Sequence, residues 1–558
     1  MYLRTTRRKN KDGSVVEYYQ LAHNYRHPET NRCVAEVIHN FGRTDQLNRD
    51  DLVRLCRSIA RVCGLEVHDP LQGEGATLSN REACLPDEIK LIGTLELGTV
   101  LVAETLWERL GIGPALRKAA SQNRCKVPYE RALFAMTANR LCEPESKLGV
   151  WDRWLSKVYL PSCTELKLAQ MYEAMDLLHD HVEAVENAVF FQTANLFNLV
   201  VDLIFYDTTT AAFSIDEEDD LRCFGRPKQG GFAPQVIVAL AVTRQGLPVR
   251  SWVFPGNTPD TETVKRIRAD LRGWKLGRAL FVADSGLNSA ENREELAKAC
   301  GTYLLATRMG SVSEIKDGVL TRGGRYKVIA DNLHAKEVMV GQGGLRRRYI
   351  LCYNPKEAKR QQEHRAEVVK ELEQELNRHP GRSATAKWAI ELLASGRYKR
   401  YLTITAKGEI ALDSKAVKDA ARYDGKWVLI TNDDTLSLED AAQGYKGLLV
   451  IERCFRALKR TRIKMEPMYH WLPRRIEAHV KICAFALLIE RVAEIECDKP
   501  WPKIRESLRT LQASEFKTPT HRFIQRNELS RELQGILKSV KIQAPKAVLG
   551  AEPLAVNE

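Results

Sequence analysis

Hydrophobic and polar positions follow two different periods in the first part of the chain. Up to residue 48 they alternate, as in VVEYYQLAHNY and CVAEVIHNFG, with KDG and PETN as turn signals. From there to residue 197 apolar residues recur at helical spacing, as in DLVRLCRSIARVCG and PYERALFAMTANRL. The pattern predicts a small antiparallel sheet followed by a helical region.

A third pattern begins at Asn198. NLVVDLIFYDTTTAAFSI is a continuous β-branched run, typical of a strand buried on both faces of a sheet. APQVIVALAVT and LPVRSWVFPG predict two further strands, and helical segments then alternate with the short strands RALFVAD and TYLLATR. A meander followed by strand and helix in alternation predicts a mixed α/β sheet.

The sheet pattern is interrupted further along the chain. Strand-like pieces such as EVMVG and RRYILCYN surround one long charged helix, and GKWVLIT then resumes the buried-strand type. SLED opens another helix with Ser437 as its N-cap. We interpret the middle part as an insertion into the α/β core. After Pro502 the pattern predicts two short helices and an Ala/Pro-rich end.

A chain of 558 residues exceeds what one hydrophobic core serves, so we expect several domains. The patterns divide the chain into six parts. These are a small antiparallel β region (1–48), a helical region (49–197), a first part of the α/β core (198–310), a β-rich insertion with a charged helix (311–422), a second part of the core (423–495) and a C-terminal tail (496–558).

The net charge of the chain indicates a class of binding partner. Lys and Arg exceed Asp and Glu by 85 − 72 = +13, which favours a polyanion such as nucleic acid or an anionic membrane face, although a merely basic soluble protein stays open. No apolar run approaches the roughly 20 residues of a bilayer span, and no secretory signal is visible, so we expect a cytoplasmic protein without membrane contact. The 13 cysteines contain no C-x-x-C pair, which argues against a zinc ribbon.

Three acidic residues are candidates for one site. Asp207 lies on the same strand face as Leu203 and Phe205, Asp284 ends the strand RALFVAD, and Glu452 lies in YKGLLVIERCFRALKR. Carboxylates at strand ends of one sheet can converge, and an all-oxygen site suits Mg²⁺ or Mn²⁺ rather than zinc. Taken singly, the two aspartates could be turn or cap residues, and Glu452 could pair with a nearby arginine.

Spacing strengthens the case for Glu452. Tyr445 precedes it by seven residues and Lys459 follows it by seven, so an unbroken helix would place all three on one stripe. Apolar residues from Leu448 to Leu458 fill a broad core-facing stripe, and basic residues occupy the opposite side. Glu452 is therefore predicted on the seam between core and basic surface, where a phosphodiester backbone and a metal can meet.

These residues resemble a known family. Tyr445, Glu452 and Lys459 match the Y-x2-R-x3-E-x6-K signature of bacterial insertion-sequence transposases with a DDE active site, although Leu448 stands at the arginine position. YDTT is similar to the family's first-aspartate strand, PGNTPDTET to its G-N turn and ADSGLNSAEN to its second-aspartate motif. The resemblance covers residues 198–481, and the 452 − 284 = 168 residues before Glu452 leave room for the insertion.

The resemblance implies a ribonuclease H-like core and a cut-and-paste DNA transposase. Asp207, Asp284 and Glu452 would hold two Mg²⁺ or Mn²⁺ ions. Tyr445 and Lys459 would position phosphates at the DNA end. Other DNA contacts would come from a set of basic residues beside Glu452, namely Arg453, Arg456 and Arg460.

The partners expected from the resemblance are double-stranded DNA, as transposon ends and target, and a second copy of the chain, as a homodimer on DNA at the bacterial nucleoid. The N-terminal sheet and the helical region would read the terminal inverted repeats. Two alternatives stay open: a ribonuclease H-like nuclease that cuts without joining, and a non-catalytic DNA-binding protein derived from a transposase.

Overall fold

The computed structural model shows two compact units, Met1–Leu85 and Pro86–Glu558. It describes residues 2–10, 15–26, 33–44, 55–56, 58–59, 89–122, 127–199, 201–214, 217–225, 232–274, 276, 279–310, 312–343, 346–379, 381 and 383–554. The helix predicted for DLVRLCRSIARVCG lies outside the described residues except at four positions.

The first unit is a three-stranded antiparallel sheet in the order β1-β2-β3. Its strands are β1 (Tyr2–Lys9), β2 (Val15–Arg26) and β3 (Cys33–Arg43). Val16 and Ala22, both on β2, are buried. These strands confirm the predicted small antiparallel sheet. The prediction worked because alternating apolar and polar positions suit strands with one covered face.

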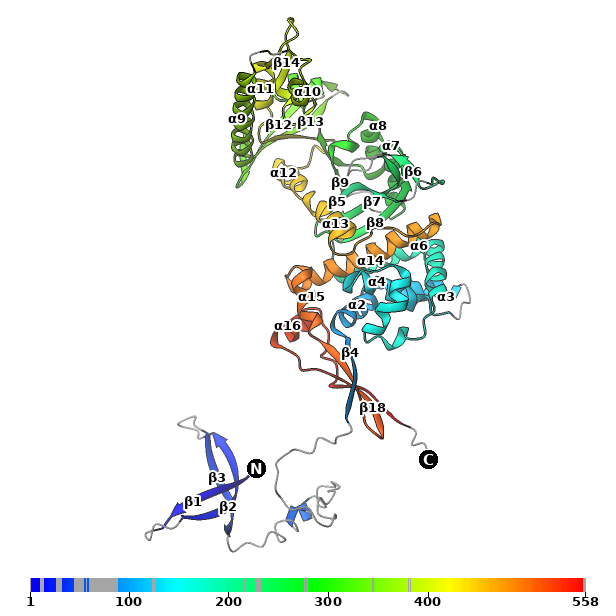
Figure 1. Cartoon of the computed structure of the whole chain (residues 1–558), viewed down its shortest axis with the longest axis vertical. Coiled ribbons are helices and arrows are strands. Elements are labelled where there is room, and N and C mark those ends of the chain that lie inside the picture. Colours follow the sequence, from blue (N-terminus) through cyan, green and yellow to red (C-terminus); the bar gives the residue numbers. More distant parts are fainter. Residues whose placement is uncertain are drawn as a thin grey trace. The chain divides into compact units, whose positions relative to one another are not determined.

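The second unit contains the predicted helical region. Its helices are α2 (Gly98–Arg109), α3 (Ile112–Gln122), α4 (Tyr129–Cys142), α5 (Lys147–Gly149) and α6 (Leu168–Leu196). The much later helix α14 (Pro473–Cys497) packs against α4 and α6 on one side and against strand β8 on the other (Figure 1, orange). Trp107 of α2 accordingly meets Phe134 of α4 and Phe485 of α14 with ring centroids 5.5 and 6.2 Å away.

The core sheet begins with the strand predicted from NLVVDLIFYDTTTAAFSI. Five strands follow the order β8-β7-β5-β9-β10, in which β5, β7 and β8 form an antiparallel meander and β9 and β10 run parallel to β5. This order is that of a ribonuclease H-like fold, so the predicted fold class is confirmed. The bounds are β5 (Leu203–Ala212), β7 (Ala233–Thr243), β8 (Pro248–Pro255), β9 (Leu280–Ala283) and β10 (Tyr303–Thr307), with the short β6 (Cys223–Gly225) pairing beside β8 on β7.

Helices cover both faces of this sheet. The hydrophobic cluster on one face includes residues of α7 (Asp260–Gly273) and α8 (Ala290–Cys300), packed on Ile204 and Tyr206. The opposite face carries α12 (Leu438–Lys446) and α13 (Leu449–Arg456), which lie along β9 and β5 in Figure 1. Ser437 caps α12 by accepting a hydrogen bond from the Asp440 amide, as predicted.

The strands of the insertion extend the same sheet beyond β10. β16, from the second part of the core, pairs with β10, and the insertion strands follow it in the order β13-β12-β11, all paired antiparallel. Their bounds are β11 (Lys327–Ala330), β12 (Leu333–Val340), β13 (Arg347–Tyr353) and β16 (Lys426–Thr431). Two small separate cores lie further out, built from α9 (Pro355–Arg378), α10 (Lys387–Ala394), β14 (Leu402–Ile404), β15 (Ile410–Leu412) and α11 (Ser414–Ala421).

The C-terminal part contains the two predicted short helices, α15 (Trp501–Arg509) and α16 (Arg531–Ser539), but the prediction of helices alone was wrong. A four-stranded antiparallel sheet has the order β19-β18-β17-β4. Its strands are β4 (Lys90–Glu96), β17 (Gln512–Lys517), β18 (His521–Arg526) and β19 (Val548–Pro553). The short, polar segments QASEFK and HRFIQR give a weak hydrophobic signal, and β17 takes one of its partners from the distant residues of β4.

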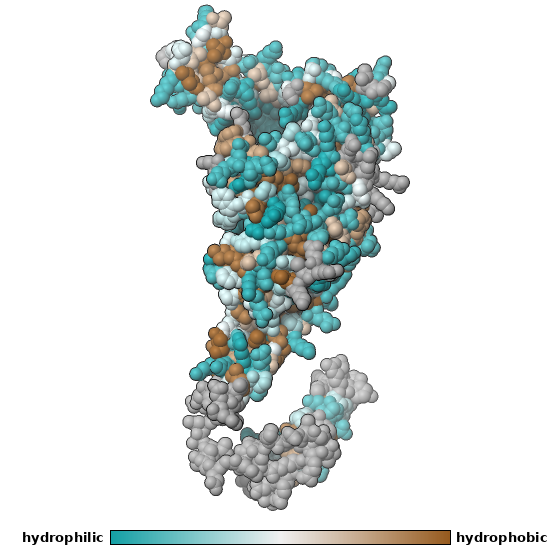
Figure 2. Space-filling model, turned by 90° about the vertical axis from the view of Figure 1, so that its right-hand side faces the viewer, coloured by the Kyte–Doolittle hydropathy of each residue, from teal (hydrophilic) through white to brown (hydrophobic). Residues whose placement is uncertain are grey.

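The surface is mixed in character. On the face shown in Figure 2, hydrophilic residues are spread widely, with hydrophobic ones between them in small groups. Among the described residues, we find no helix whose length and apolar character would suffice to cross a membrane.

Candidate active site

The first two candidate carboxylates lie on neighbouring parallel strands. Tyr206 of β5 is the register partner of Ala283 of β9, an offset of 283 − 206 = 77 residues. Asp207 follows Tyr206 within β5, and Asp284 follows Ala283 directly after the end of β9, so the two residues lie at the same level of the sheet. β9 ends at Ala283 while β5 continues to Ala212, so no described strand pairs with β5 beside Asp207 on that side.

The third carboxylate comes from the helices above that sheet face. A Cβ atom built on Gly444 would lie 3.4 Å from Leu203 Cδ1, and one built on Gly447 only 2.3 Å from Phe205 Cζ. The helical segments therefore advance along β5 in the direction of increasing residue number. Strand alternation places Asp207 on this same face, one step beyond Phe205, and α13 continues the same way to Glu452.

Tyr445 joins the helical segment to the strand ends. Its hydroxyl donates a hydrogen bond to Asp284 Oδ1 over 3.3 Å. Burial and then the negative charges of Asp284 and Glu452 raise the pKa of Tyr445, so the phenol stays protonated and remains a donor. Both carboxylates act on the same hydroxyl group, so Asp284 and Glu452 both lie near Tyr445.

The three carboxylates differ in exposure. Asp207 is half-buried and its Oδ1 accepts a 2.7 Å hydrogen bond from the Thr208 amide, whereas Asp284 and Glu452 are exposed. Among the described residues, no group of three or more His, Cys, Asp or Glu side chains stands close enough together to hold a metal ion. Like charges repel, and the exposed side chains of Asp284 and Glu452 can change rotamer. The donor set is all oxygen and fits a hard divalent cation.

A fourth acid lies near the site and was missed in the sequence. Asp260 is the first residue of α7, and its Oδ2 is 4.0 Å from the position of a Cβ built on Gly286, two residues after Asp284. The buried Tyr206 has its pKa raised by burial and then by the charges of Asp207 and Asp260. The signal was present in PGNTPDTET, which was interpreted only as a turn.

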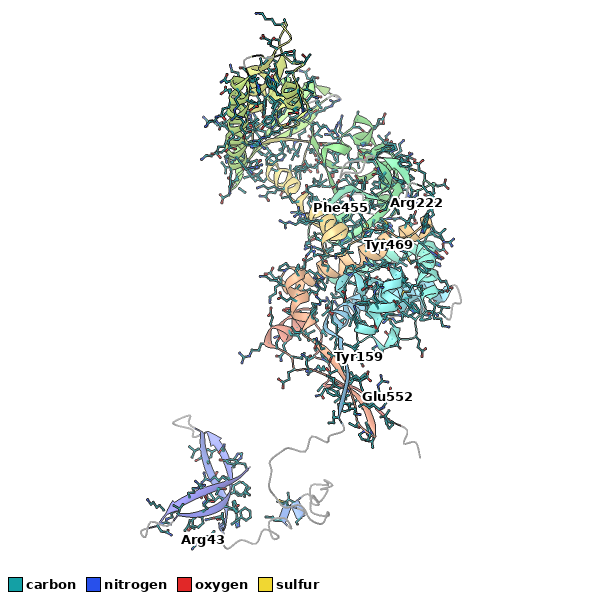
Figure 3. All side chains as sticks on the ribbon, in the orientation of Figure 1. Arg43, Tyr159, Arg222, Phe455, Tyr469 and Glu552 are labelled. Atoms are coloured by element: carbon teal, nitrogen blue, oxygen red, sulfur yellow. The ribbon has the colours of Figure 1, made fainter. Side chains whose placement is uncertain are left out.

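The condition of an unbroken helix from Tyr445 to Lys459 is not met. α12 ends at Lys446, α13 begins at Leu449, and a π-helical turn, η8, follows from Ala457 to Thr461. Because the π turn changes the angular spacing, Lys459 is buried, with Nζ 3.5 Å from Glu466 Oε1. Leu448, at the signature's arginine position, is also buried, as is Phe455 of α13, labelled in Figure 3.

Exposed cations flank Glu452 on the solvent side. Arg453 and Arg456 are exposed and line a cavity of about 870 Å³ between the α13–η8 segment and the end of α14. Arg462, Arg491 and Lys499 contribute further positive charge to its wall. The side chain of Arg460 lies outside the described residues.

Two parts of the chain match models of known protein families. A family model described as "Transposase DDE domain" matches residues 208–489, which is 489 − 208 + 1 = 282 of the 558 residues. A second, the N-terminal domain of IS1634 family transposases, matches residues 3–69. The chain is similar to a solved structure described as a Mos1 transposase paired-end complex with left transposon end, at 12% identity and a TM-score of 0.13. That match covers 45% of this chain and 66% of the other, slightly under two thirds. No curated protein matched.

Proposed function

Because the chain belongs to the DDE transposase family, we propose that it cuts DNA at the ends of an insertion sequence and joins the freed 3′-hydroxyls to target DNA. The observation that carries the proposal is the register of β5 and β9, which sets Asp207 and Asp284 at one level, together with the hydrogen bond from Tyr445 of the Glu452 segment to Asp284. Such a site at strand ends of a mixed sheet suits metal-assisted transfer between phosphodiesters.

We assign the metal-holding role to Asp207, Asp284 and Glu452. Two Mg²⁺ or Mn²⁺ ions would activate the attacking oxygen and stabilise the leaving oxygen. Asp207 is fixed by the Thr208 amide, and Tyr445 orients Asp284, so the strand-borne ligands are anchored while Glu452 stays adjustable on its helix.

DNA would approach across the basic side of α13. Arg453 and Arg456 are exposed there next to Glu452, and phosphate contacts from arginine position a duplex without reading its sequence. They take over the phosphate contact that the buried Leu448 cannot make. Arg460 and Lys459 belong to the same proposed DNA-binding set, and Lys459 would contact an end phosphate by exchanging Glu466, its present ion-pair partner, for that phosphate.

The remaining parts of the chain would select and pair the DNA ends. Residues 1–48 and the helical region 49–197 would read the terminal inverted repeats. Cut-and-paste movement needs both ends held together, so the acting form would be a homodimer on DNA. Phosphate contacts dominate such binding, and the net charge of +13 makes it salt-dependent.

The test is a strand-transfer assay with purified protein, Mg²⁺ and a labelled duplex carrying one end of the element. We expect cleaved ends and joined products, both lost with EDTA and in Asp284→Asn. Asp202→Asn is the matched control, because Asp202 is an exposed aspartate near the same strand, paired with Arg244. Nicks without joined products would instead support the nuclease, and full activity in Asp284→Asn would refute the assignment of this site.

A further inference from the structure

A second group of cations lies buried away from the carboxylates. Arg140 near the end of α4, Lys147 at the start of α5 and His479 of α14 are 5%, 3% and 4% exposed. Lys147 Nζ lies 3.3 Å from His479 Nδ1, while His479 Nε2 lies 3.0 Å from the Met465 carbonyl oxygen. The carbonyl requires a proton on Nε2, so Nδ1 accepts from Lys147 and the imidazole is neutral.

Neither cation is bonded to a described carboxylate, although Glu145 and Glu466 also line the adjoining cavity and the charge of Glu145 acts on Arg140, where the effect of burial on the pKa is larger. Among the described side chains, no carboxylate forms an ion pair with Lys147 or Arg140, and the nearby Glu145 is paired with Arg153 instead. Arg140 donates to the carbonyl oxygens of Lys464 and Glu145, yet its buried Nε has no hydrogen-bond partner. A buried charge without a counter-charge costs several kcal/mol, so two together need a compensating group.

The pKa values of the cluster agree with this excess of positive charge. Burial and then the charge of Arg140 lower the pKa of Lys147 to about 7. Burial and then the charge of Lys147 lower the pKa of His470 to about 3, and the pKa of His479 is lowered for the same reasons. An anion bound between them would reverse these shifts.

The cluster borders a cavity large enough for a ligand. Its volume is about 470 Å³, and its wall includes Arg140, Lys147, His470 and His479. Tyr469 also lines it and is 66% exposed (Figure 3). An exposed aromatic ring beside a cationic cavity offers a face on which a nucleobase can stack.

We propose that this cavity, the Lys147 pocket, binds a phosphate monoester. Two buried cations need about two negative charges, which a terminal phosphate supplies near neutral pH and a backbone phosphodiester, with one charge, does not. The cations are too deeply buried to contact the sugar-phosphate backbone of a duplex, whereas a terminal phosphate on a flexible strand can enter the cavity.

The loop beside the pocket also serves the proposed active site. Glu466 lines the pocket and is the ion-pair partner of Lys459, seven residues after Glu452. Because the pocket lies beside the proposed active site, we expect the phosphate to belong to the end of a DNA strand. This choice rests on the proposed function. Free inorganic phosphate is the second source of the same chemistry.

The experiment measures binding without metal, so that no cleavage is required. Fluorescent single strands with a 5′-phosphate, a 3′-phosphate or hydroxyls at both ends are titrated against the full chain and Lys147→Met. The exposed Lys157, paired with Glu143, provides the control Lys157→Met. Thermal unfolding with and without inorganic phosphate is recorded for each protein. Lys147→Met replaces a buried charge by an apolar group of similar length, so it should fold.

We expect one of the phosphorylated strands to bind at least tenfold more tightly than the hydroxyl strand. The preference should disappear in Lys147→Met and persist in Lys157→Met. Stabilisation of the original chain by inorganic phosphate, without a preference among strands, would support the pocket and assign it to the free ion. Equal behaviour of Lys147→Met and the original chain in both measurements would overturn the proposal. Strand transfer is assayed separately, so failure here leaves the proposed function standing, and the reverse also holds.

Discussion

Gly447 sets the distance between the Glu452 helix and the strand that bears Asp207. In Gly447→Ala the new Cβ would lie 2.3 Å from Phe205 Cζ and 3.0 Å from the Gly444 carbonyl oxygen. Carbon atoms in contact stand about 3.5–4.0 Å apart, so the helix must move from β5 by roughly 1 Å. Glu452, five residues further on, would move with it.

The expected effects on stability and activity differ in size. Overpacking of this kind costs about 1–3 kcal/mol, and alanine regains up to about 1 kcal/mol over glycine because Gly447 already has a helical φ of −63°. The net loss of unfolding free energy should be about 1–2 kcal/mol. A displacement of about 1 Å at a reacting group can lower a rate by about 100-fold. The rate of strand cleavage should therefore fall by about 100-fold while the protein stays folded.

The assay combines urea unfolding with the rate of strand cleavage on a duplex carrying one end. Gly444→Ala is the matched control, since its Cβ would lie 3.4 Å from Leu203 Cδ1, an ordinary contact. That variant should gain up to about 1 kcal/mol and keep its activity. Unchanged cleavage in Gly447→Ala, or the same loss in both variants, would refute the packing of Gly447 as the constraint on Glu452.

Three further predictions concern other contacts. Tyr445→Phe removes the hydrogen bond to Asp284, and cleavage should slow by roughly tenfold, the equivalent of about 1.4 kcal/mol, in a single-turnover assay. The folded pKa of Lys147, about 7, lies below the unfolded value of 10.5, so the unfolded chain binds more protons between these pH values. Stability should therefore rise with pH from 7 to 10.5, and the rise should be smaller in Lys147→Met when urea midpoints are compared. Glu186→Ala leaves Lys481 buried without its 2.9 Å partner and should cost about 3–5 kcal/mol of unfolding free energy, again measured in urea.

Local signals in the sequence were enough to predict much of the core. The apolar run before Asp207 and the strand RALFVAD before Asp284 are buried strands because their apolar side chains are covered by helices on both faces. Ser437 was identifiable as a helix cap because its side chain acts on an amide only three residues away. These features depend on neighbours in the chain, so hydrophobic period and capping chemistry suffice to predict them.

Features that depend on distant contacts could not be predicted in the same way. The turn that buries Lys459 follows from a π-helical distortion and an ion pair with Glu466, neither visible in residue spacing. The Lys147 pocket joins Lys147 to His479, 332 positions apart, and no pattern in the sequence relates them. Asp260 was within a motif already noted, but only the fold shows that it lies near Asp284.

The packing of α14 against α4 and α6 means that the helical region cannot finish its core during early synthesis. The apolar faces that it presents stay uncovered until the last sixth of the polypeptide has left the ribosome. A product that ends just before Pro473 would contain Asp207, Asp284 and Glu452 but would lack α14, so the apolar faces of α4 and α6 would stay exposed to aggregation or proteolysis. Premature termination in this stretch should therefore give an unstable fragment rather than a folded one.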